Sequence, residues 1–144
     1  MLSAIQIKQH LFTRVEVHCD PECMEAPENE SYEVTLSATE PTQETNNSPW
    51  KMNVDVRFGP SDKAKPVRYQ GHLTLVGIFE VHPDFSEDKR LDLLRLNGGS
   101  LLLGAIREMV LTITSRSARG PFELPTFDAR MFLKQTKTPQ VLGN

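Results

Sequence analysis

Apolar and polar residues alternate along four stretches of the chain between residues 4 and 82, as they do in strands that bury one side. The stretches cover residues 4–19, 32–39, 50–58 and 67–82, and the segments between them are rich in Pro, Asn, Gly and charged residues, as exposed loops are. We therefore predict four strands in an antiparallel meander. The apolar sets are Ile5, Ile7, Leu11, Thr13, Val15 and Val17; Tyr32, Val34 and Leu36; Trp50, Met52, Val54, Val56 and Phe58; and Tyr69, Gly71, Leu73, Leu75, Gly77, Phe79 and Val81.

The periodicity becomes helical after the last of these strands. A first helix is expected from about Ser86 and is expected to end at the Asn-Gly-Gly of residues 97–99. A second helix is expected from Ser100 to about Ser117 or Ala118. The sequence thus predicts an α+β fold, a four-stranded antiparallel sheet with two C-terminal helices, as one domain over residues 1–133. Residues 134–144 are polar and are expected to form a flexible tail.

The second helix is apolar over more of its circumference than one sheet can cover. One stripe repeats at spacings of three or four, and Leu102, Ala105, Met109 and Thr112 form an adjacent face. A helix lying on a single sheet needs only one apolar stripe. Either the helix is buried between the sheet and the first helix, or a second subunit covers it, and oligomerisation is the favoured reading. The predicted subunit interface is the stripe of Leu103, Ile106, Val110 and Ile113.

Charge is distributed unevenly along the 144 residues, although the net charge is only -3. Residues 15–50 contain no Lys or Arg but nine acidic residues, which argues against nucleic acid as a partner of this half. The acidic span suits a basic partner or a solvated sheet rim, and composition does not separate the two. The apolar run of residues 101–113 is short and contains a charged pair, and the N-terminus lacks a signal-peptide pattern. We therefore expect a cytoplasmic protein without stable membrane insertion.

Catalytic chemistry has no recognisable motif in this chain. The four histidines are scattered singly, and Cys19 and Cys23 lack the further ligands that a zinc site needs, so free thiols are favoured. The Arg107–Glu108 pair lies within the apolar helix, but adjacent helical residues do not face each other. Each is therefore expected to pair with a neighbouring element or to lie where two helices meet. We predict no active site, no metal and no cofactor, and therefore a protein that is not an enzyme.

The segment "GPFELPTF" after the second helix is held extended by its prolines and carries Phe122, Leu124 and Phe127. Such a segment is able to line a surface groove for another extended, apolar chain. The alternative is that its aromatic residues simply cover the end of the sheet.

Five short motifs in this order resemble the SecB family of bacterial protein-export chaperones. They lie between residues 5 and 132: "MEAP" at Met24–Pro27, "GIFEV" at Gly77–Val81, "IREMV" at Ile106–Val110, "SARGPF" at Ser117–Phe122 and "FDA" at Phe127–Ala129. The resemblance implies a four-stranded sheet with two helices, assembled as a dimer of dimers, a homotetramer, through the long helix. It also implies an ATP-independent holdase that binds unfolded precursor polypeptides and delivers them to the SecA translocase.

Residue roles follow from this resemblance. Tyr32 and Phe79 join Phe122, Leu124 and Phe127 in the expected client-peptide groove. Asp20 and Glu25 match acids that face SecA in the family, Glu25 closely and Asp20 loosely, because this chain has one extra residue between them.

The chain departs from the family at three places. The segment "PFELPT" is shorter, Gly104-Ala105 replaces a Pro-Tyr, and the acidic C-terminal tail is replaced by "KQTKTPQVLGN". These departures leave a second function open, a SecB-like chaperone dedicated to one partner such as the antitoxin of a toxin–antitoxin system. A small-ligand-binding domain is a third alternative.

Overall fold

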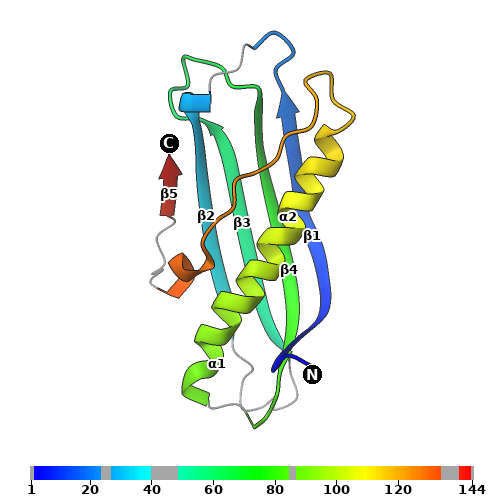
Figure 1. Ribbon diagram of the computed structural model, residues 1–144, viewed down its shortest axis with the longest axis vertical. Coiled ribbons are helices and arrows are strands. Elements are labelled where there is room, and N and C mark those ends of the chain that lie inside the picture. Colours follow the sequence, from blue (N-terminus) through cyan, green and yellow to red (C-terminus); the bar gives the residue numbers. More distant parts are fainter. Residues whose placement is uncertain (1, 24–26, 40–48, 85–86, 134–139, 144) are drawn as a thin grey trace.

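A five-stranded antiparallel sheet forms one layer of the molecule in the computed structural model (Figure 1). The structure describes residues 2–23, 27–39, 49–84, 87–133 and 140–143. The strand order is β1-β4-β3-β2-β5, and every neighbouring pair is antiparallel. The strands are β1 (Ile5–Cys19), β2 (Glu30–Thr39), β3 (Trp50–Pro60), β4 (Tyr69–Val81) and the short β5 (Gln140–Gly143).

The four predicted strands and their antiparallel pairing are confirmed, but their order is not a complete meander. β2, β3 and β4 follow one another across the sheet, whereas β1 lies beside β4 rather than beside β2. The connection from β1 to β2 spans residues 20–29 and includes the single turn η1 (Pro27–Asn29). A connection of this length reaches from one side of the sheet to the other, which a tight hairpin of two to five residues cannot do.

The two predicted helices are one continuous helical rod. α1 (Glu87–Leu93) passes through the π-helical turn η3 (Leu94–Gly98) into α2 (Gly99–Thr114). The expected stop at the two glycines was wrong, because Gly98 and Gly99 have right-handed helical dihedrals. Their lack of a side chain serves close packing: a Cβ on Gly98 would lie 2.9 Å from the sulfur of Met52, and one on Gly99 would lie 2.7 Å from the ring of Phe132.

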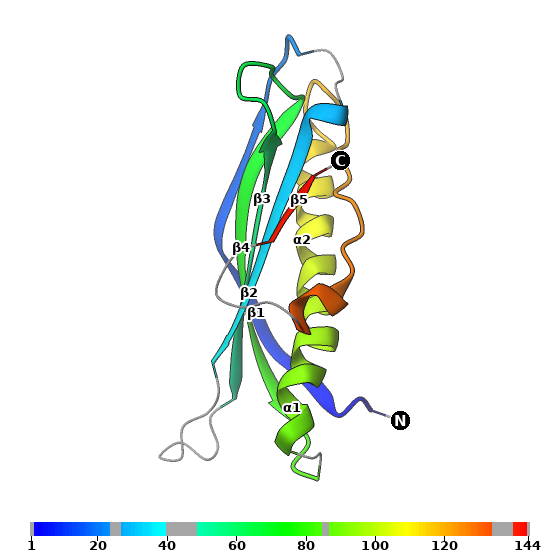
Figure 2. The same cartoon turned by 90° about the vertical axis from the view of Figure 1, so that its left-hand side faces the viewer.

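The helical rod covers one face of the sheet, which we call the helix face, and leaves the other, the outer face, uncovered by helix (Figure 2). The predicted apolar sets of β2, β3 and β4 point to the helix face, and Val34, Met52, Val54, Val56, Leu73, Leu75 and Phe79 are fully buried there. Gly71 and Gly77 mark close approaches, since a Cβ on either would collide with Phe58 or Leu102. The core therefore lies between the sheet and α2.

The apolar set predicted for β1 needs one correction. The register of β1 against β4 shifts between Ile7 and Gln9 and again between Phe12 and Arg14. Between the two shifts Phe12 lies opposite Leu75 on the helix face, and Leu11 lies opposite Val76 on the outer face. A bulge inserts one residue and reverses which side the following residues face, which strict alternation does not anticipate.

After α2 the chain returns across the helix face of the sheet (Figure 1). Residues 121–128 are extended, and we call them the strap. The short helix η4 (Ala129–Leu133) follows, and the chain ends in β5, which pairs with β2. The C-terminal region predicted to be a flexible tail thus contains a paired strand at residues 140–143.

The helical rod from Glu87 to Thr114 is longer than either predicted helix, but it ends before the expected Ser117 or Ala118. Its 26 residues from Lys89 to Thr114 are long and apolar enough to cross a membrane by length and composition. The core helix of a soluble protein meets the same criterion, and here one side of α2 packs on the sheet through Leu102, Ile106 and Val110.

Candidate functional site

The strap holds its alternate side chains in the core. Phe122 and Leu124 are buried, the residues on either side of them are exposed, and Phe127 is half-buried. This alternation is that of a strand with one covered side, although the strap lies over the sheet rather than within it. Both prolines of the strap, Pro121 and Pro125, are on its exposed side.

Phe122 anchors the start of the strap among aromatic rings of the sheet. Its ring centroid lies 5.6 Å from that of Phe58 on β3 and 5.3 Å from that of Tyr69 on β4. The guanidinium carbon of Arg68 lies 5.6 Å from the Phe122 ring centroid, within the range of a cation–π contact. Burial of the ring and these contacts make Phe122 part of the hydrophobic core.

Phe127 meets Tyr32 of β2 at the far end of the strap. The two rings are edge to face, with centroids 5.9 Å apart and planes inclined by 65°. The Tyr32 hydroxyl donates a hydrogen bond to Glu30 Oε2 at 2.8 Å. Burial, followed by the hydrogen bond and the charge of Glu30, raises the pKa of the Tyr32 phenol. The phenol therefore stays protonated at ordinary pH, and an acid lies beside an aromatic pair near the edge of β2.

The five predicted groove residues do not all lie together within the protomer. Phe79 lies on β4 opposite Ile7 and Trp50, and the edge of its ring lies close to Gly98 of the helical rod. Tyr32 and Phe127 lie together, and Phe122 lies with a different pair of rings. Four of the five residues are buried within the protomer, and Phe127 is half-exposed.

Thr114 ties the end of α2 to the strap. Its buried hydroxyl accepts a hydrogen bond from the Phe122 amide at 2.8 Å and donates to the Val110 carbonyl at 2.7 Å. Sequence analysis missed this residue. Thr114 continues the stripe of Ile106 and Val110 by four positions, and a polar residue on an apolar stripe is the signal that points to it.

Arg107 holds the middle of the strap. Its Nε donates to the Leu124 carbonyl at 3.1 Å, and its terminal nitrogen pairs with Glu123 Oε1 at 3.0 Å. The expectation that Arg107 pairs with a neighbouring element is confirmed. The Tyr69 hydroxyl adds a further tie, because it donates to the carbonyl of Gly120 at the turn before the strap.

The stripe predicted as a subunit interface lies against the chain's own sheet. Leu103, Ile106 and Val110 are buried within the protomer, and only Ile113, near the helix end, is exposed. The burial of these three residues is accounted for within a single chain.

The opposite side of α2, which we call its outward face, is short of charge for a solvent-facing surface. It consists of Leu101, Gly104, Glu108 and Thr112, and Leu101 is 52% exposed. A Cβ on Gly104 would meet nothing within 4 Å, so packing within the protomer does not explain this glycine. Of these four residues, only Leu101 exposes a large apolar side chain.

β1 also exposes apolar side chains. Ile7, Leu11 and Val15 are 38%, 42% and 40% exposed, and β1 is at one edge of the described sheet. Long edges with apolar side chains are surfaces at which other chains associate.

The outer face of the sheet carries a polar network. Asp55 of β3 accepts hydrogen bonds at 2.7 Å from His72 Nε2 and at 2.8 Å from the Thr74 hydroxyl. Arg14 lies 3.0 Å from His72 Nδ1, and Arg57 pairs with the other Asp55 oxygen. Burial alone would raise the pKa of the Asp55 carboxyl, but the bonds from His72 and Thr74 and the nearby charges hold it below its usual value.

This network is arranged for structure rather than for catalysis. The Thr74 hydroxyl donates to Asp55, so it is not placed as a nucleophile beside the imidazole. Within the described residues no cluster of three His, Cys, Asp or Glu side chains is suited to a metal ion. Neither Cys19 nor Cys23 forms a disulfide within the described residues, and the Cys23 thiol donates a hydrogen bond to the Pro66 carbonyl at 3.2 Å.

Of the two acids expected to face a translocase, the structure describes Asp20 but not Glu25. Asp20 lies in the turn after β1, where its carboxylate accepts a hydrogen bond from the Glu22 amide at 3.0 Å. Its carbonyl accepts a hydrogen bond from Arg119 at 3.2 Å. Asp20 thus connects the ends of β1 and α2, and Glu25 lies outside the described residues.

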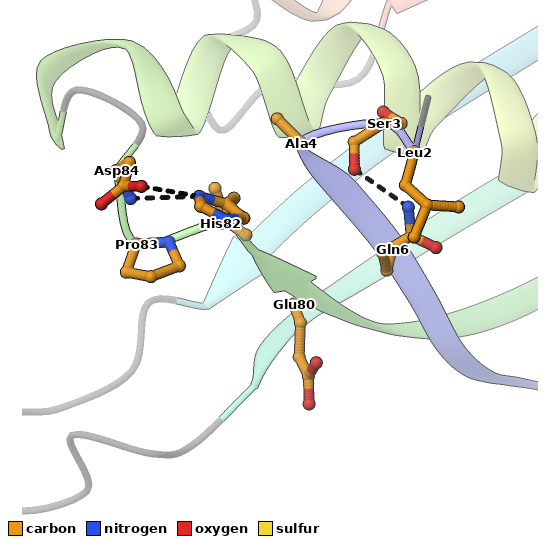
Figure 3. Close-up of a pocket in the computed structure, with 9 residues that line it drawn as sticks. Leu2, Ser3, Ala4, Gln6, Glu80, His82, Pro83 and Asp84 are labelled. Carbon is orange, nitrogen blue, oxygen red and sulfur yellow. Dashed lines mark hydrogen bonds and ion pairs between the residues drawn. The ribbon is translucent and has the colours of Figure 1, made fainter.

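A cleft of about 670 Å³ lies at the opposite end of the sheet, where β1 begins and β4 ends (Figure 3). Ser3, Ala4 and Gln6 line one side, and His82, Pro83 and Asp84 line the other. The cleft contains none of the predicted groove residues.

The fold is similar to that of a solved chaperone structure. The Mycobacterium tuberculosis SecB-like chaperone Rv1957, in complex with a ChAD peptide from the Rv1956 HigA1 antitoxin, superposes with a TM-score of 0.60 at 16% identity, over 86% of this chain and 91% of that one. The chain has a SecB-like fold. A Streptococcus agalactiae protein of unknown function matches at a TM-score of 0.46 and 11% identity, over 85% and 97% of the two chains. No family model and no curated protein matches the sequence.

Proposed function

We propose that this protein is a chaperone that binds extended, apolar segments of other polypeptides without using nucleotide or metal. The observation that carries the proposal is the SecB-like fold. It is shared over most of the chain with a chaperone whose structure is in complex with an antitoxin peptide. The exposed apolar residues of α2 and β1 and the half-exposed Phe127 support it, because such surfaces serve binding rather than the stability of one chain.

Of the two versions predicted from the sequence, a chaperone dedicated to one partner has more support than one for general export. Delivery to SecA calls for an acidic docking surface. Among the residues that the structure describes, acids of the outer face have basic partners: Glu80 pairs with Lys8 at 3.1 Å, and Asp55 lies between His72 and Arg57. An antitoxin is a partner of the kind bound by the structural neighbour, and the cytoplasm is the compartment in which we propose that binding occurs.

We further propose that the protein assembles into dimers or a tetramer through the outward face of α2. Leu101 and Gly104 support this assignment, since the first is exposed and the second leaves room for a close helix contact. Leu101→Asp is expected to lower the mass measured by light scattering, and Ser37→Asp, at an exposed position on the outer face, is the matched control. An unchanged mass for Leu101→Asp would remove the outward face from the assembly.

Suppression of client aggregation tests the chaperone proposal itself. A slow-folding protein is diluted from denaturant without ATP, and its light scattering is followed at increasing ratios of this protein. We expect scattering to fall in proportion to added protein. Scattering that is unaffected at a several-fold excess would contradict the proposal. Affinity capture from the native cell then separates the two versions, because a dedicated chaperone retains one protein and a general holdase retains many.

A further inference from the structure

The chain's own C-terminal strand occupies one end of the edge of β2. β5 runs antiparallel to β2 with Ser31 opposite Gly143, Tyr32 opposite Leu142, Glu33 opposite Val141 and Val34 opposite Gln140. Figure 1 shows β5 beside β2, on the side of the sheet away from β1. This edge therefore accepts an extended segment in antiparallel register.

The pairing of β5 with β2 is a backbone ladder, and a backbone ladder does not depend on side-chain identity. Any extended segment that reaches the same edge is able to form the same hydrogen bonds, which is how β-augmentation recognises peptides. β5 contributes four residues, whereas β2 has ten. A terminal strand this short opens at low free-energy cost compared with the core strands.

The charge of β2 indicates which kind of segment fits this edge. β2 contains Glu30 and Glu33, follows Glu28 of η1, and lies within the span of residues 15–50 that has no Lys or Arg. The chain from Lys134 to Asn144, which delivers β5, has two lysines and no acidic residue. The paired residues Gln140–Gly143 are uncharged, whereas β2 carries Glu30 and Glu33, so this edge favours an occupant that brings Lys or Arg.

The same edge adjoins the aromatic pair of the strap. Leu142 is at the register position opposite Tyr32, and the Tyr32 ring contacts Phe127. A strand added here pairs with the backbone of Tyr32, whose ring packs on the half-exposed Phe127.

We propose that β5 is an internal substitute for a partner strand: an extended polypeptide segment with apolar residues flanked by Lys or Arg displaces β5 and pairs with β2 at Ser31–Val34. The inference rests on the proposed polypeptide-binding function and specifies where and how the partner binds. While β5 is in place it competes with the partner, and the apparent affinity is reduced by the fraction of molecules in which the edge is closed.

Two variants of the full chain shift this competition in opposite directions. Val141→Pro with Leu142→Pro breaks the β5 ladder and keeps chain length and charge. Glu33→Cys with Val141→Cys, in a Cys19→Ser background, joins two residues that lie directly opposite each other, so that oxidation locks β5 onto β2. Val141→Ile is the matched control, because it preserves strand propensity, and the reduced form of the locked variant is its own control.

The probe is a fluorescein-labelled peptide with the sequence Lys134–Asn144, and its binding is followed by anisotropy. We expect the proline variant to bind the peptide at least about tenfold more tightly than the unaltered chain. The oxidised locked variant should not bind it, and reduction should restore binding. A peptide with both lysines changed to Glu should bind more weakly to the proline variant.

Equal affinity of the proline variant and the unaltered chain, or no binding by the proline variant at millimolar peptide, would overturn the inference. A change in solution mass of the proline variant without a change in peptide affinity would show that β5 pairs between copies of the chain, which also contradicts the inference.

The experiments distinguish failure of this inference from failure of the proposed chaperone function. If the protein suppresses aggregation but is insensitive to locking of β5, the chaperone function stands and this inference falls; if it suppresses nothing, the chaperone function falls whatever the peptide does.

Discussion

The strap and β5 both follow α2 in the chain and both contact β2, but they are held by different kinds of contact. The strap is fixed by buried side chains, Phe122 and Leu124, and by hydrogen bonds from Arg107 and to Thr114. β5 is joined to β2 by a ladder of four residue pairs. The first set of contacts depends on the side chains present, and the second does not.

This difference separates the part of the site that belongs to the fold from the part that a partner is able to replace. Removing the strap would open a cavity among Phe58, Tyr69 and α2, which is costly in a packed core. Replacing β5 exchanges one strand for another and keeps the ladder. We therefore expect the strap to remain in place during binding and the edge of β2 to change its occupant.

Phe122→Ala should have the largest effect on stability. The ring is buried and contacts two other rings, so its truncation is expected to lower the free energy of unfolding by about 3–5 kcal/mol. Urea denaturation measures the loss, and Glu123→Ala, at the exposed neighbouring position, is the control, with an expected change within about 0.5 kcal/mol. A loss as small as that of the control would mean that the strap is not part of the core.

Thr114→Val should have the next largest effect. The substitution keeps the shape of the side chain but leaves the buried Phe122 amide without its acceptor, at an expected cost of about 1–3 kcal/mol. Thr112→Val, on the outward face of α2, lacks this contact and serves as the control. If the two variants unfold at the same urea concentration, the hydroxyl of Thr114 does not fasten the strap.

Arg107→Met should cost about 1 kcal/mol, since it removes one hydrogen bond to the Leu124 carbonyl and retains most of the apolar stem. Glu123→Gln should cost less, because the ion pair it removes is largely exposed. Thermal unfolding of the two variants and of the double variant checks the order. A larger loss for Glu123→Gln than for Arg107→Met would show that the ion pair, rather than the carbonyl contact, holds the strap.

The proline pair in β5, Val141→Pro with Leu142→Pro, should have the smallest effect on stability, about 1 kcal/mol or less, because a terminal strand opens locally before the core unfolds. Urea denaturation under the conditions used for Phe122→Ala gives the comparison directly. A loss as large as that of Phe122→Ala would show that β5 is integral to the fold, and the distinction between strap and β5 would then be lost.

The sheet was predictable from the sequence because period-two alternation reports directly on which side of a strand is buried. The exceptions have local causes. Two register shifts in β1 move Leu11 to the outer face, and Gly98 and Gly99 continue a helix where they were expected to end one. The register shifts and the continued helix both depend on packing against other elements of the fold. Phe12 and Phe132 contribute to that packing, which a local sequence pattern does not reveal.

The candidate site was predictable only in part, for a similar reason. The residue types in "GPFELPTF" indicated that the strap is apolar and extended. They did not indicate that Phe122 and Leu124 are buried in the core of the same chain. Three of the four residues predicted for contact between subunits, Leu103, Ile106 and Val110, are buried within the protomer, whereas Ile113 is exposed. Periodicity shows that a helix has faces, and the partner of each face follows from the tertiary fold.

Amide-resolved NMR of the full chain, titrated with a reduced and carboxymethylated unfolded protein, tests the central claim most directly. If an extended polypeptide binds at the edge of β2 beside the strap, the largest shift changes should fall on the amides of Ser31–Val34 and Phe127. The amides of Asp55, His72 and Thr74 on the outer face should remain unchanged. Changes confined to those outer-face residues, or no changes at saturating client, would contradict the account.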